Sequence, residues 1–311
     1  QSDSSNSGHP LRFSTTSNGT HGGGSEYTTG VTTTGTPGSA GAKTVITVAS
    51  GAATLYYYCS SHSGMGGQAN TNSTFGSSNF GGSIQANVSA NTTAGFSIVS
   101  YTGNGTSGAT IGHGLSSKPT DIFVKARNDT TNWASQHKAL GATKFMRLND
   151  TRAVTTDTAR WNDTEPTTSV FSVGNDSETN QSANTYVAYC FAPKQGFSKF
   201  GSYTGNGNND GTYVHLGFRP AWIMIKRTNS TQPWCMWDNK RNTFNLTENY
   251  IYANDSGAEG SGASIDLDML SNGFKLRNSG AFLNTSGDSF IYMAFAESPF
   301  VTSTGIPTTA R

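Results

Sequence analysis

The sequence is poor in charge, in hydrophobic side chains and in cysteine. Of its 311 residues, 13% are charged and 33% are hydrophobic. It contains no run of about 18 apolar residues, so we expect no insertion into a membrane. Its net charge of +1 gives no electrostatic reason to expect a nucleic acid as a partner. The chain has three cysteines, which are Cys59, Cys190 and Cys235. They are widely spaced and odd in number, which does not fit a disulfide framework.

Glycine, serine, threonine, asparagine and aromatic residues are abundant instead. The 37 glycines and the asparagines suit tight turns, threonine suits strands, and the 11% of Phe, Trp and Tyr can fill a core. Intrinsic disorder also goes with few hydrophobic residues, but disordered chains have few aromatic residues. Short apolar runs such as 186–192 and 222–225 are typical of strands. The composition therefore predicts an all-β protein.

An internal duplication organises residues 95–311. A Gly-Phe-Ser segment leads to Tyr-Thr-Gly-Asn-Gly at 95–105 and again at 196–207. Later positions match as well: Trp133 and Trp234 lie 101 residues apart (234 minus 133). A period of roughly 100 residues is longer than a solenoid repeat and has the size of a β-sandwich. We therefore predict two tandem β-sandwich modules, residues 95–195 and 196–311.

The part of the chain before the duplication is divided by its composition. Residues 1–94 hold four charged residues, which are Asp3, Arg12, Glu26 and Lys43. Residues 71–94 are rich in Gly, Ser, Asn and Thr with isolated apolar residues, which indicates a linker that carries one or two edge strands. Residues 1–70 are then a separate segment.

The N-terminal segment contains one motif with the residue types of a metal site. A Tyr-rich strand ends in Cys59, and His62 and Met65 follow at Cys-x2-His-x2-Met spacing. A thiolate, an imidazole and a weak thioether ligand suit a trigonal copper site, which also needs a histidine from an earlier strand. His9 is the natural candidate, and His21 is the reserve. We expect no resident cofactor, and copper is the alternative that this motif allows.

This loop resembles the short ligand loop of cupredoxins of the amicyanin type. The resemblance implies a cupredoxin-like frame with His9, Cys59 and His62 as equatorial ligands and Met65 as the axial ligand. Cupredoxins have further strands before the first ligand histidine, whereas eight residues precede His9 here. The segment 1–70 would therefore be an incomplete cupredoxin, completed by another chain or by a longer polypeptide. An inherited frame that packs these side chains without metal is the alternative.

A second resemblance covers nearly the whole chain. Residues 9–14, 56–67, 101–105 and 203–207 resemble elements of tail-fibre and related structural proteins of marine bacteriophages, in particular cyanophages. The resemblance implies a non-enzymatic virion protein with lectin-like, concanavalin-type sandwiches. Such a subunit of a tail fibre or appendage would lie on the virion surface, outside the cell, and serve host attachment. A homotrimer, contacts with other virion proteins and a host surface glycan as ligand follow from the fibre analogy.

Two other functions stay open. A self-assembling extracellular or virion scaffold without a receptor would complete its first sheet with strands from a neighbouring subunit. A copper-binding redox protein would depend on the cluster around Cys59.

Aromatic side chains are the next candidates for a binding site. Trp161 lies in the polar run 160–164, so we expect it to be exposed and able to stack on a sugar ring. Trp133 and Trp234 occupy equivalent positions in the repeat, which favours a packing role. The alternation around Trp222 predicts that this side chain faces inward from a strand.

The evidence for an enzyme is thin. Asp163 with Glu165, or Asp266 with Asp268, could pair as the acid and base of a glycosidase. The alternation of Asp266 and Asp268 with apolar residues instead predicts the solvent face of a strand. The segment 206–210 could bind calcium, although turn chemistry explains it equally well. No Gly-x-Ser-x-Gly elbow occurs, and we expect no enzymatic activity.

Overall fold

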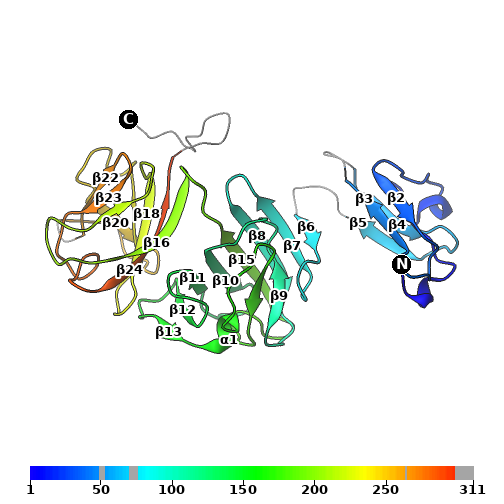
Figure 1. The fold of residues 1–311 in the computed structure, drawn as a ribbon, viewed down its shortest axis with the longest axis horizontal. Helices are drawn as coiled ribbons and strands as arrows, with labels where there is room; N and C mark the ends of the chain where they lie inside the picture. The colour runs from blue at the N-terminus through cyan, green and yellow to red at the C-terminus, as the bar shows by residue number, and fades with distance from the viewer. Residues whose placement is uncertain (49–52, 70–75, 263–264, 298–311) are drawn as a thin grey trace. The chain divides into compact units, whose positions relative to one another are not determined.

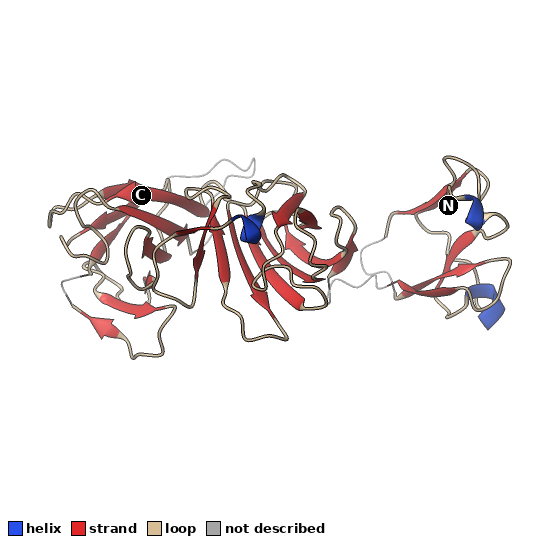
Figure 2. Ribbon diagram, turned by 90° about the horizontal axis from the view of Figure 1, so that it is seen from below, coloured by secondary structure: helices blue, strands red, loops and turns tan. Residues whose placement is uncertain are grey.

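The computed structural model describes residues 1–48, 53–69, 76–262 and 265–297. About 40% of the chain is strand and about 4% is helix, and Figure 2 shows how strands dominate. The prediction of an all-β sandwich protein is confirmed. Within these described ranges, no helix has both the length and the hydropathy needed to cross a membrane. By their contacts the residues form two compact units, 1–77 and 78–311.

Unit 1 is built from short strands and two single-turn helices. Its elements are η1 (Ser4–Asn6), β1 (Leu11–Ser14), η2 (Gly19–Gly22), β2 (Val31–Thr34), β3 (Lys43–Ile46), β4 (Leu55–Cys59) and β5 (Gly66–Ala69). One antiparallel sheet has the order β1-β4-β5, and β2 pairs with β3 in a second. Leu55 and Tyr58 of β4 are buried. Gly19 lies against the Tyr58 ring, where a β-carbon would come within 2.4 Å of ring atoms.

Unit 2 contains two sandwiches. Sandwich 1 has an eight-stranded sheet of order β13-β12-β11-β10-β15-β8-β7-β6, and β14 and β9 form its second sheet. Its elements are β6 (Ser77–Asn79), β7 (Ala86–Asn91), β8 (Phe96–Thr102), β9 (Ala109–Gly112), β10 (Asp121–Ala126), β11 (Ala134–His137), β12 (Lys144–Arg147), β13 (Thr155–Thr156), α1 (Thr158–Trp161), β14 (Val170–Val173) and β15 (Thr185–Phe191).

Sandwich 2 has a six-stranded sheet of order β16-β24-β18-β19-β20-β21 and a three-stranded sheet of order β17-β23-β22. Its elements are β16 (Ser198–Thr204), β17 (Tyr213–His215), β18 (Trp222–Arg227), β19 (Cys235–Asp238), β20 (Asn249–Tyr252), β21 (Gly260–Ser261), β22 (Leu267–Leu270), β23 (Gly273–Leu276) and β24 (Ser289–Phe295).

The large sheets of the two sandwiches repeat one another. From β8 to β13 in the first and from β16 to β21 in the second, the strands follow in the same order. The register repeats too: Tyr101 pairs with Tyr186, and Tyr203 pairs with Phe290. Ile98 pairs with Tyr189, and Phe200 pairs with Met293 in the corresponding position. The duplication seen in the sequence is therefore a duplication of sheet topology.

The predicted linker 71–94 carries two strands at the edge of a sheet, in line with the one or two edge strands expected, and these strands belong to sandwich 1. Residues 70–75 lie outside the described part, but 77–91 contain β6 and β7, which extend the large sheet of sandwich 1 beyond β8. Ala86 and Val88 are buried and alternate with exposed neighbours, as a half-buried strand requires. Among the described residues, sandwich 2 has no strand beyond β16, which forms an edge of its sheet.

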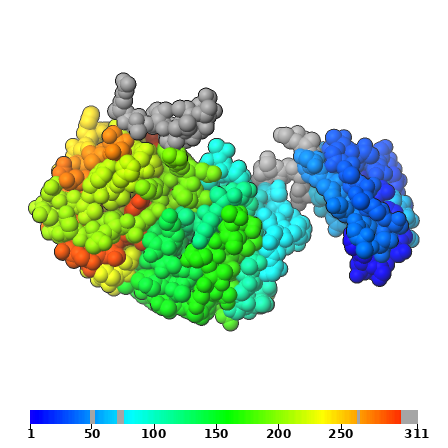
Figure 3. Space-filling model, viewed as in Figure 1, coloured from blue at the N-terminus to red at the C-terminus, as the bar shows by residue number. Residues whose placement is uncertain are grey.

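The outer faces of the two large sheets pack against each other. Phe123, Met224, Trp234 and Met293 belong to one buried cluster that draws on both sandwiches. The indole nitrogen of Trp234 also donates to the carbonyl oxygen of Arg147 across this boundary, at 2.9 Å. Figure 1 and Figure 3 show the sandwiches in direct contact within unit 2. The apolar cluster makes them one packed body.

Candidate metal centre

The first sheet of unit 1 places His9 beside Cys59. β1 and β4 are antiparallel with Leu11 opposite Cys59, so the residues just before β1 lie next to the end of β4. The Ser60 nitrogen donates to the Pro10 carbonyl oxygen at 3.0 Å, which continues the pairing beyond the strand. His9 therefore reaches the cluster from 50 residues away in sequence.

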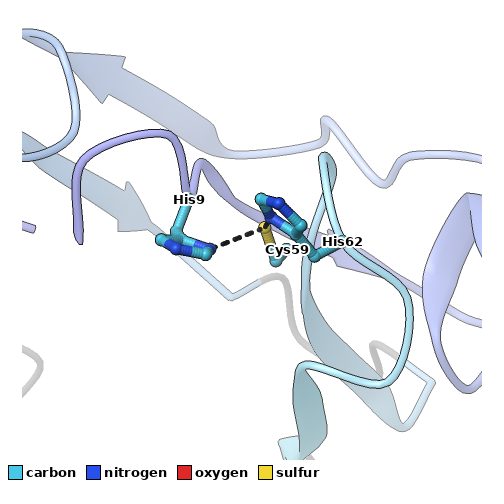
Figure 4. A group of neighbouring side chains, drawn as sticks. All are labelled: His9, Cys59 and His62. Carbon is cyan, nitrogen blue, oxygen red and sulfur yellow. Dashed lines mark hydrogen bonds between the residues drawn. The ribbon is translucent and has the colours of Figure 1, made fainter. Parts of the chain in front are cut away.

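Three of the predicted ligands form a compact group, shown in Figure 4. The Cys59 sulfur lies 3.7 Å from Nδ1 of His9 and 3.6 Å from Nδ1 of His62. The two imidazole rings are 4.5 Å apart at their centroids. One donor atom from each residue falls within 4.8 Å of the others. Cys59 is buried, and His62 is exposed.

The loop that carries His62 is anchored at both ends. Asn18 accepts a hydrogen bond of 2.8 Å from the Gly64 nitrogen and donates one of 2.9 Å to the Ser63 hydroxyl. Gly64 has a φ of 76°, a left-handed conformation that glycine adopts at little cost. At Gly66, a β-carbon would come within 2.1 Å of the Tyr57 carbonyl oxygen. The glycines therefore let the loop turn back tightly onto β4.

The two sulfur–nitrogen separations match those of ligands that share one metal ion. With metal–sulfur bonds of about 2.3 Å and metal–nitrogen bonds of about 2.0 Å, a sulfur and a nitrogen ligand lie about 3.5 Å apart at the tetrahedral angle. At 120° the same bonds place them about 3.7 Å apart. The observed separations from Cys59 to His9 and His62 are 3.7 and 3.6 Å. A soft thiolate with two imidazoles is a donor set for copper or zinc.

The other two predicted ligands, Met65 and His21, lie outside the group of three donor residues. Met65 is held by its main chain, since its carbonyl oxygen accepts a 2.8 Å hydrogen bond from the Cys59 nitrogen, while the residue is 47% exposed. His21 contacts the Cys59 carbonyl oxygen through Nε2 at 3.1 Å and meets the Tyr58 ring edge-on. His21 thus supports the strand end without joining the donor group.

The prediction that Trp161 is exposed is wrong. Trp161 is 0% exposed and lies in the core of sandwich 1. It ends α1, a four-residue helix whose first turn is capped by Asp157, and the turn carries the indole inward. The neighbouring Arg160 is also buried, over the Phe145 ring and paired with Glu178 at 3.0 Å. Polar neighbours here mark a buried ion-pair network instead of an exposed loop.

The other tryptophans take part in packing. Trp133 and Trp234 both contact the cluster between the sandwiches, as the repeat suggested. Trp222 joins this same cluster, so it faces the neighbouring sandwich and not the core of its own.

The paired carboxylates do not form an acid–base site. Asp163 is exposed, and Glu165 pairs with Lys118 at 3.0 Å. Asp266 and Asp268 are both buried, so the prediction that they face solvent is wrong. Asp268 pairs with Arg277 at 2.5 Å, which lets a carboxylate lie on a covered strand. Burial raises the pKa of Asp266.

Turn chemistry accounts for the segment 206–210. The Asn206 side chain accepts a hydrogen bond from the Asn208 nitrogen, and the Asn208 side chain accepts one from the Asp210 nitrogen. The Asp210 carboxylate pairs with Lys275 at 2.6 Å. The side-chain oxygens of Asn206 and Asn208 are therefore used within the loop, and the Asp210 carboxylate is paired with a lysine of β23.

An open hollow of about 480 Å³ lies on sandwich 1, and no motif in the sequence predicted it. It is lined by Ile84, Gln85, Ala86, Asn87, Ser100, Tyr101, Thr102, Arg127 and Thr185. These residues come from three strands and a turn that are far apart in the chain. No local motif could have joined them, and only the pairing of β7, β8 and β15 brings them together.

Comparison with known proteins gives one family. Residues 67–299 match the model of a domain of unknown function, DUF7483. No curated protein and no solved structure matches the chain. The matched range covers both sandwiches and begins after His62, so the three donor residues precede it.

Proposed function

The chain belongs to the DUF7483 family, a domain of unknown function, and we propose that its N-terminal unit binds one copper ion through His9, Cys59 and His62. The observation that carries this proposal is the pair of sulfur–nitrogen separations, 3.7 and 3.6 Å, around one buried thiol. Such separations match ligands that share an ion.

The choice of copper over a structural zinc ion rests on the donor count, and the separate titration with Zn(II) tests an open zinc site. Structural zinc sites have four protein ligands, whereas trigonal copper sites have two histidines, one cysteine and a weak, distant fourth ligand. Here three donors converge, and Met65 is adjacent through its main chain while its side chain stays half exposed. When bound, copper would supply one-electron redox chemistry. The chain's own part is to hold a thiolate and two imidazoles in place.

The test uses the full chain, freed of metal and titrated with Cu(II) and, separately, with Zn(II). We expect one equivalent of copper to bind and to produce an intense visible band from thiolate-to-copper charge transfer. Cys59→Ser should abolish the band, and His9→Ala should weaken copper binding by at least tenfold. His21→Ala is the matched control, because His21 lies nearby outside the donor group. A colourless sample loaded with copper, or Cys59→Ser behaving as the wild type, would refute the proposal.

For the chain as a whole, we propose a non-enzymatic subunit of a virion tail fibre or appendage that serves host attachment through surface glycans. Two features support this role. The chain has few charged residues, 13% of the sequence, and each sandwich has its core filled by apolar side chains. Copies displayed together on a particle would bind a weak polar ligand tightly by avidity.

Host binding by the purified chain tests this second proposal. We expect saturable binding to host cells that free surface polysaccharide competes away. Filaments formed by the purified chain without any binding to cells would favour a self-assembling scaffold instead.

A further inference from the structure

The outer face of the large sheet of sandwich 1 has a covered part and an open part. Over β10 to β12 it is covered by sandwich 2, as Phe123 and Met146 show. Over β7 and β8 it is open, and polar side chains lie there beside the exposed Ile98. Ala86 and Tyr101 point into the core, so their neighbours Asn87 and Ser100 point outward. The hollow of about 480 Å³ lies on this open part.

The polar side chains that line the hollow have free hydrogen-bonding groups. They are Gln85, Asn87, Ser100, Thr102, Arg127 and Thr185. Within the described part of the chain, none of these six side chains has a hydrogen-bond or ion-pair partner, although the main-chain nitrogens of Arg127 and Thr185 are bonded. Two amides, three hydroxyls and a guanidinium therefore converge on one space of the size of small-molecule pockets.

The charge of the hollow points to an anionic ligand. Arg127 is its one charged lining residue, and no carboxylate lines it. The nearest acidic residue in sequence, Asp129, already accepts a hydrogen bond from Asn184. The Arg127 main chain is held to β15, because its nitrogen donates to the Thr185 carbonyl oxygen at 2.7 Å. This bond fixes the point from which the exposed guanidinium extends, and a guanidinium favours a planar, bidentate anion such as a carboxylate.

Sandwich 2 provides an internal comparison. The position equivalent to Arg127 is Thr228 (127 plus 101), whose hydroxyl is used in a 3.0 Å bond to the Ser289 carbonyl oxygen. Arg227 beside it is neutralised by an ion pair with Asp288. Sandwich 2 also lacks a described counterpart of β7, which forms one wall of the hollow. The arrangement of polar side chains around Arg127 is therefore present in sandwich 1 and has no described counterpart in sandwich 2.

We propose that the hollow over β7, β8 and β15 binds an acidic saccharide, with the sugar carboxylate on Arg127 and sugar hydroxyls on the amides and hydroxyls around it. Sugar hydroxyls both donate and accept, as do the asparagine, glutamine, serine and threonine side chains of the lining. This inference deepens the attachment role proposed above and rests on it for its biological setting. The binding event itself is a property of the purified chain.

The test is calorimetric titration of the full chain with trigalacturonic acid, and with neutral galactotriose as the uncharged probe. We expect saturable binding of the acidic sugar, at least tenfold weaker binding of the neutral one, and weakening with added salt. Arg127→Ala should weaken binding of the acidic sugar at least tenfold, and Thr102→Glu should do the same by placing a carboxylate in the hollow. Arg219→Ala is the matched control, because Arg219 is an exposed cation of sandwich 2.

Both hollow variants alter exposed side chains, so their melting temperatures should stay within a degree or two of the wild type. Absence of binding to trigalacturonate, equal binding of both sugars, or wild-type binding by Arg127→Ala would overturn the proposal. Binding in solution without any attachment of wild-type chains to host cells would contradict the attachment role and leave the hollow assignment standing. Attachment that persists in Arg127→Ala would place the receptor contact elsewhere and refute the role of the hollow in it.

Discussion

Asn180 and Asn284 occupy equivalent places in the two sandwiches, and both are completely buried. The Asn180 side-chain oxygen accepts from the Asn104 nitrogen at 3.0 Å, and that of Asn284 accepts from the Asn206 nitrogen at 2.9 Å. The amide nitrogen of each donates to carbonyl oxygens of the surrounding loops. The repeated Tyr-Thr-Gly-Asn-Gly turn is therefore clamped by one buried amide in each sandwich.

Replacing either amide should destabilise its sandwich. Asn180→Ala or Asn284→Ala leaves several buried main-chain groups without partners, which costs roughly 3 kcal/mol of unfolding free energy. Asn209→Ala is the control, because Asn209 is exposed in the same loop region and should change stability by less than about 0.5 kcal/mol. Denaturant unfolding measures all three. A loss below 1 kcal/mol in both clamp variants would show that the amides do not hold the turns.

The contact between the sandwiches can be tested by comparing two equivalent positions, one buried in the contact and one exposed. Phe200 and Ile98 have the same register in the two sheets, but Phe200 is 3% exposed and Ile98 is 41% exposed. Phe200→Ala should cost about 3 kcal/mol, because it opens a cavity between the sandwiches. Ile98→Ala should cost about 0.5 kcal/mol. Equal effects on the unfolding free energy would mean that the buried contact contributes nothing to stability.

Lys226 should make stability depend on pH. Its side chain is 0% exposed and donates to the carbonyl oxygens of Thr151 and Arg227 without a paired carboxylate. Burial lowers its pKa from 10.5 to about 8. The unfolded chain therefore binds the proton more strongly than the folded chain. The buried charged lysine lowers the unfolding free energy by its full amount below pH 8, and this loss disappears as the pH rises towards 10.5.

Lys226→Met removes that titration. The variant should be more stable than the wild type at pH 7 by about 2 kcal/mol, and the difference should shrink between pH 8 and 9.5. Comparing the two proteins at each pH cancels the buried thiol Cys190, whose pKa is raised to about 12 and which opposes the trend. Cys235 interacts electrostatically with Lys226, so the comparison is restricted to pH values below about 9.5, well under the pKa of about 12 of that thiol. A difference in unfolding free energy that is constant over this range would contradict the assignment.

Much of this fold could be read from the sequence because its signals are local or repeated. The duplicated Tyr-Thr-Gly-Asn-Gly turn revealed two copies of one sheet topology. The loop motif supplied Cys59 and His62, and the need for a histidine from an earlier strand supplied His9, which antiparallel pairing places beside Cys59. The role of Met65 as axial ligand stays a prediction.

The features that the sequence concealed depend on tertiary packing. The membership of β7 in sandwich 1 is hidden by its Asn- and Ser-rich composition, which is that of a linker with an edge strand. Trp161 reads as exposed because its polar neighbours belong to a buried ion-pair network around Arg160. The hollow at Arg127 is assembled from β7, β8 and β15, and its members have no sequence spacing that could identify them.

X-ray absorption at the copper edge of the metal-loaded full chain tests the central claim most directly. We predict a first coordination shell with one sulfur and two imidazole nitrogens, and a shell without sulfur in Cys59→Ser. A wild-type shell made of oxygen and nitrogen alone would contradict the assignment of His9, Cys59 and His62 as one metal site.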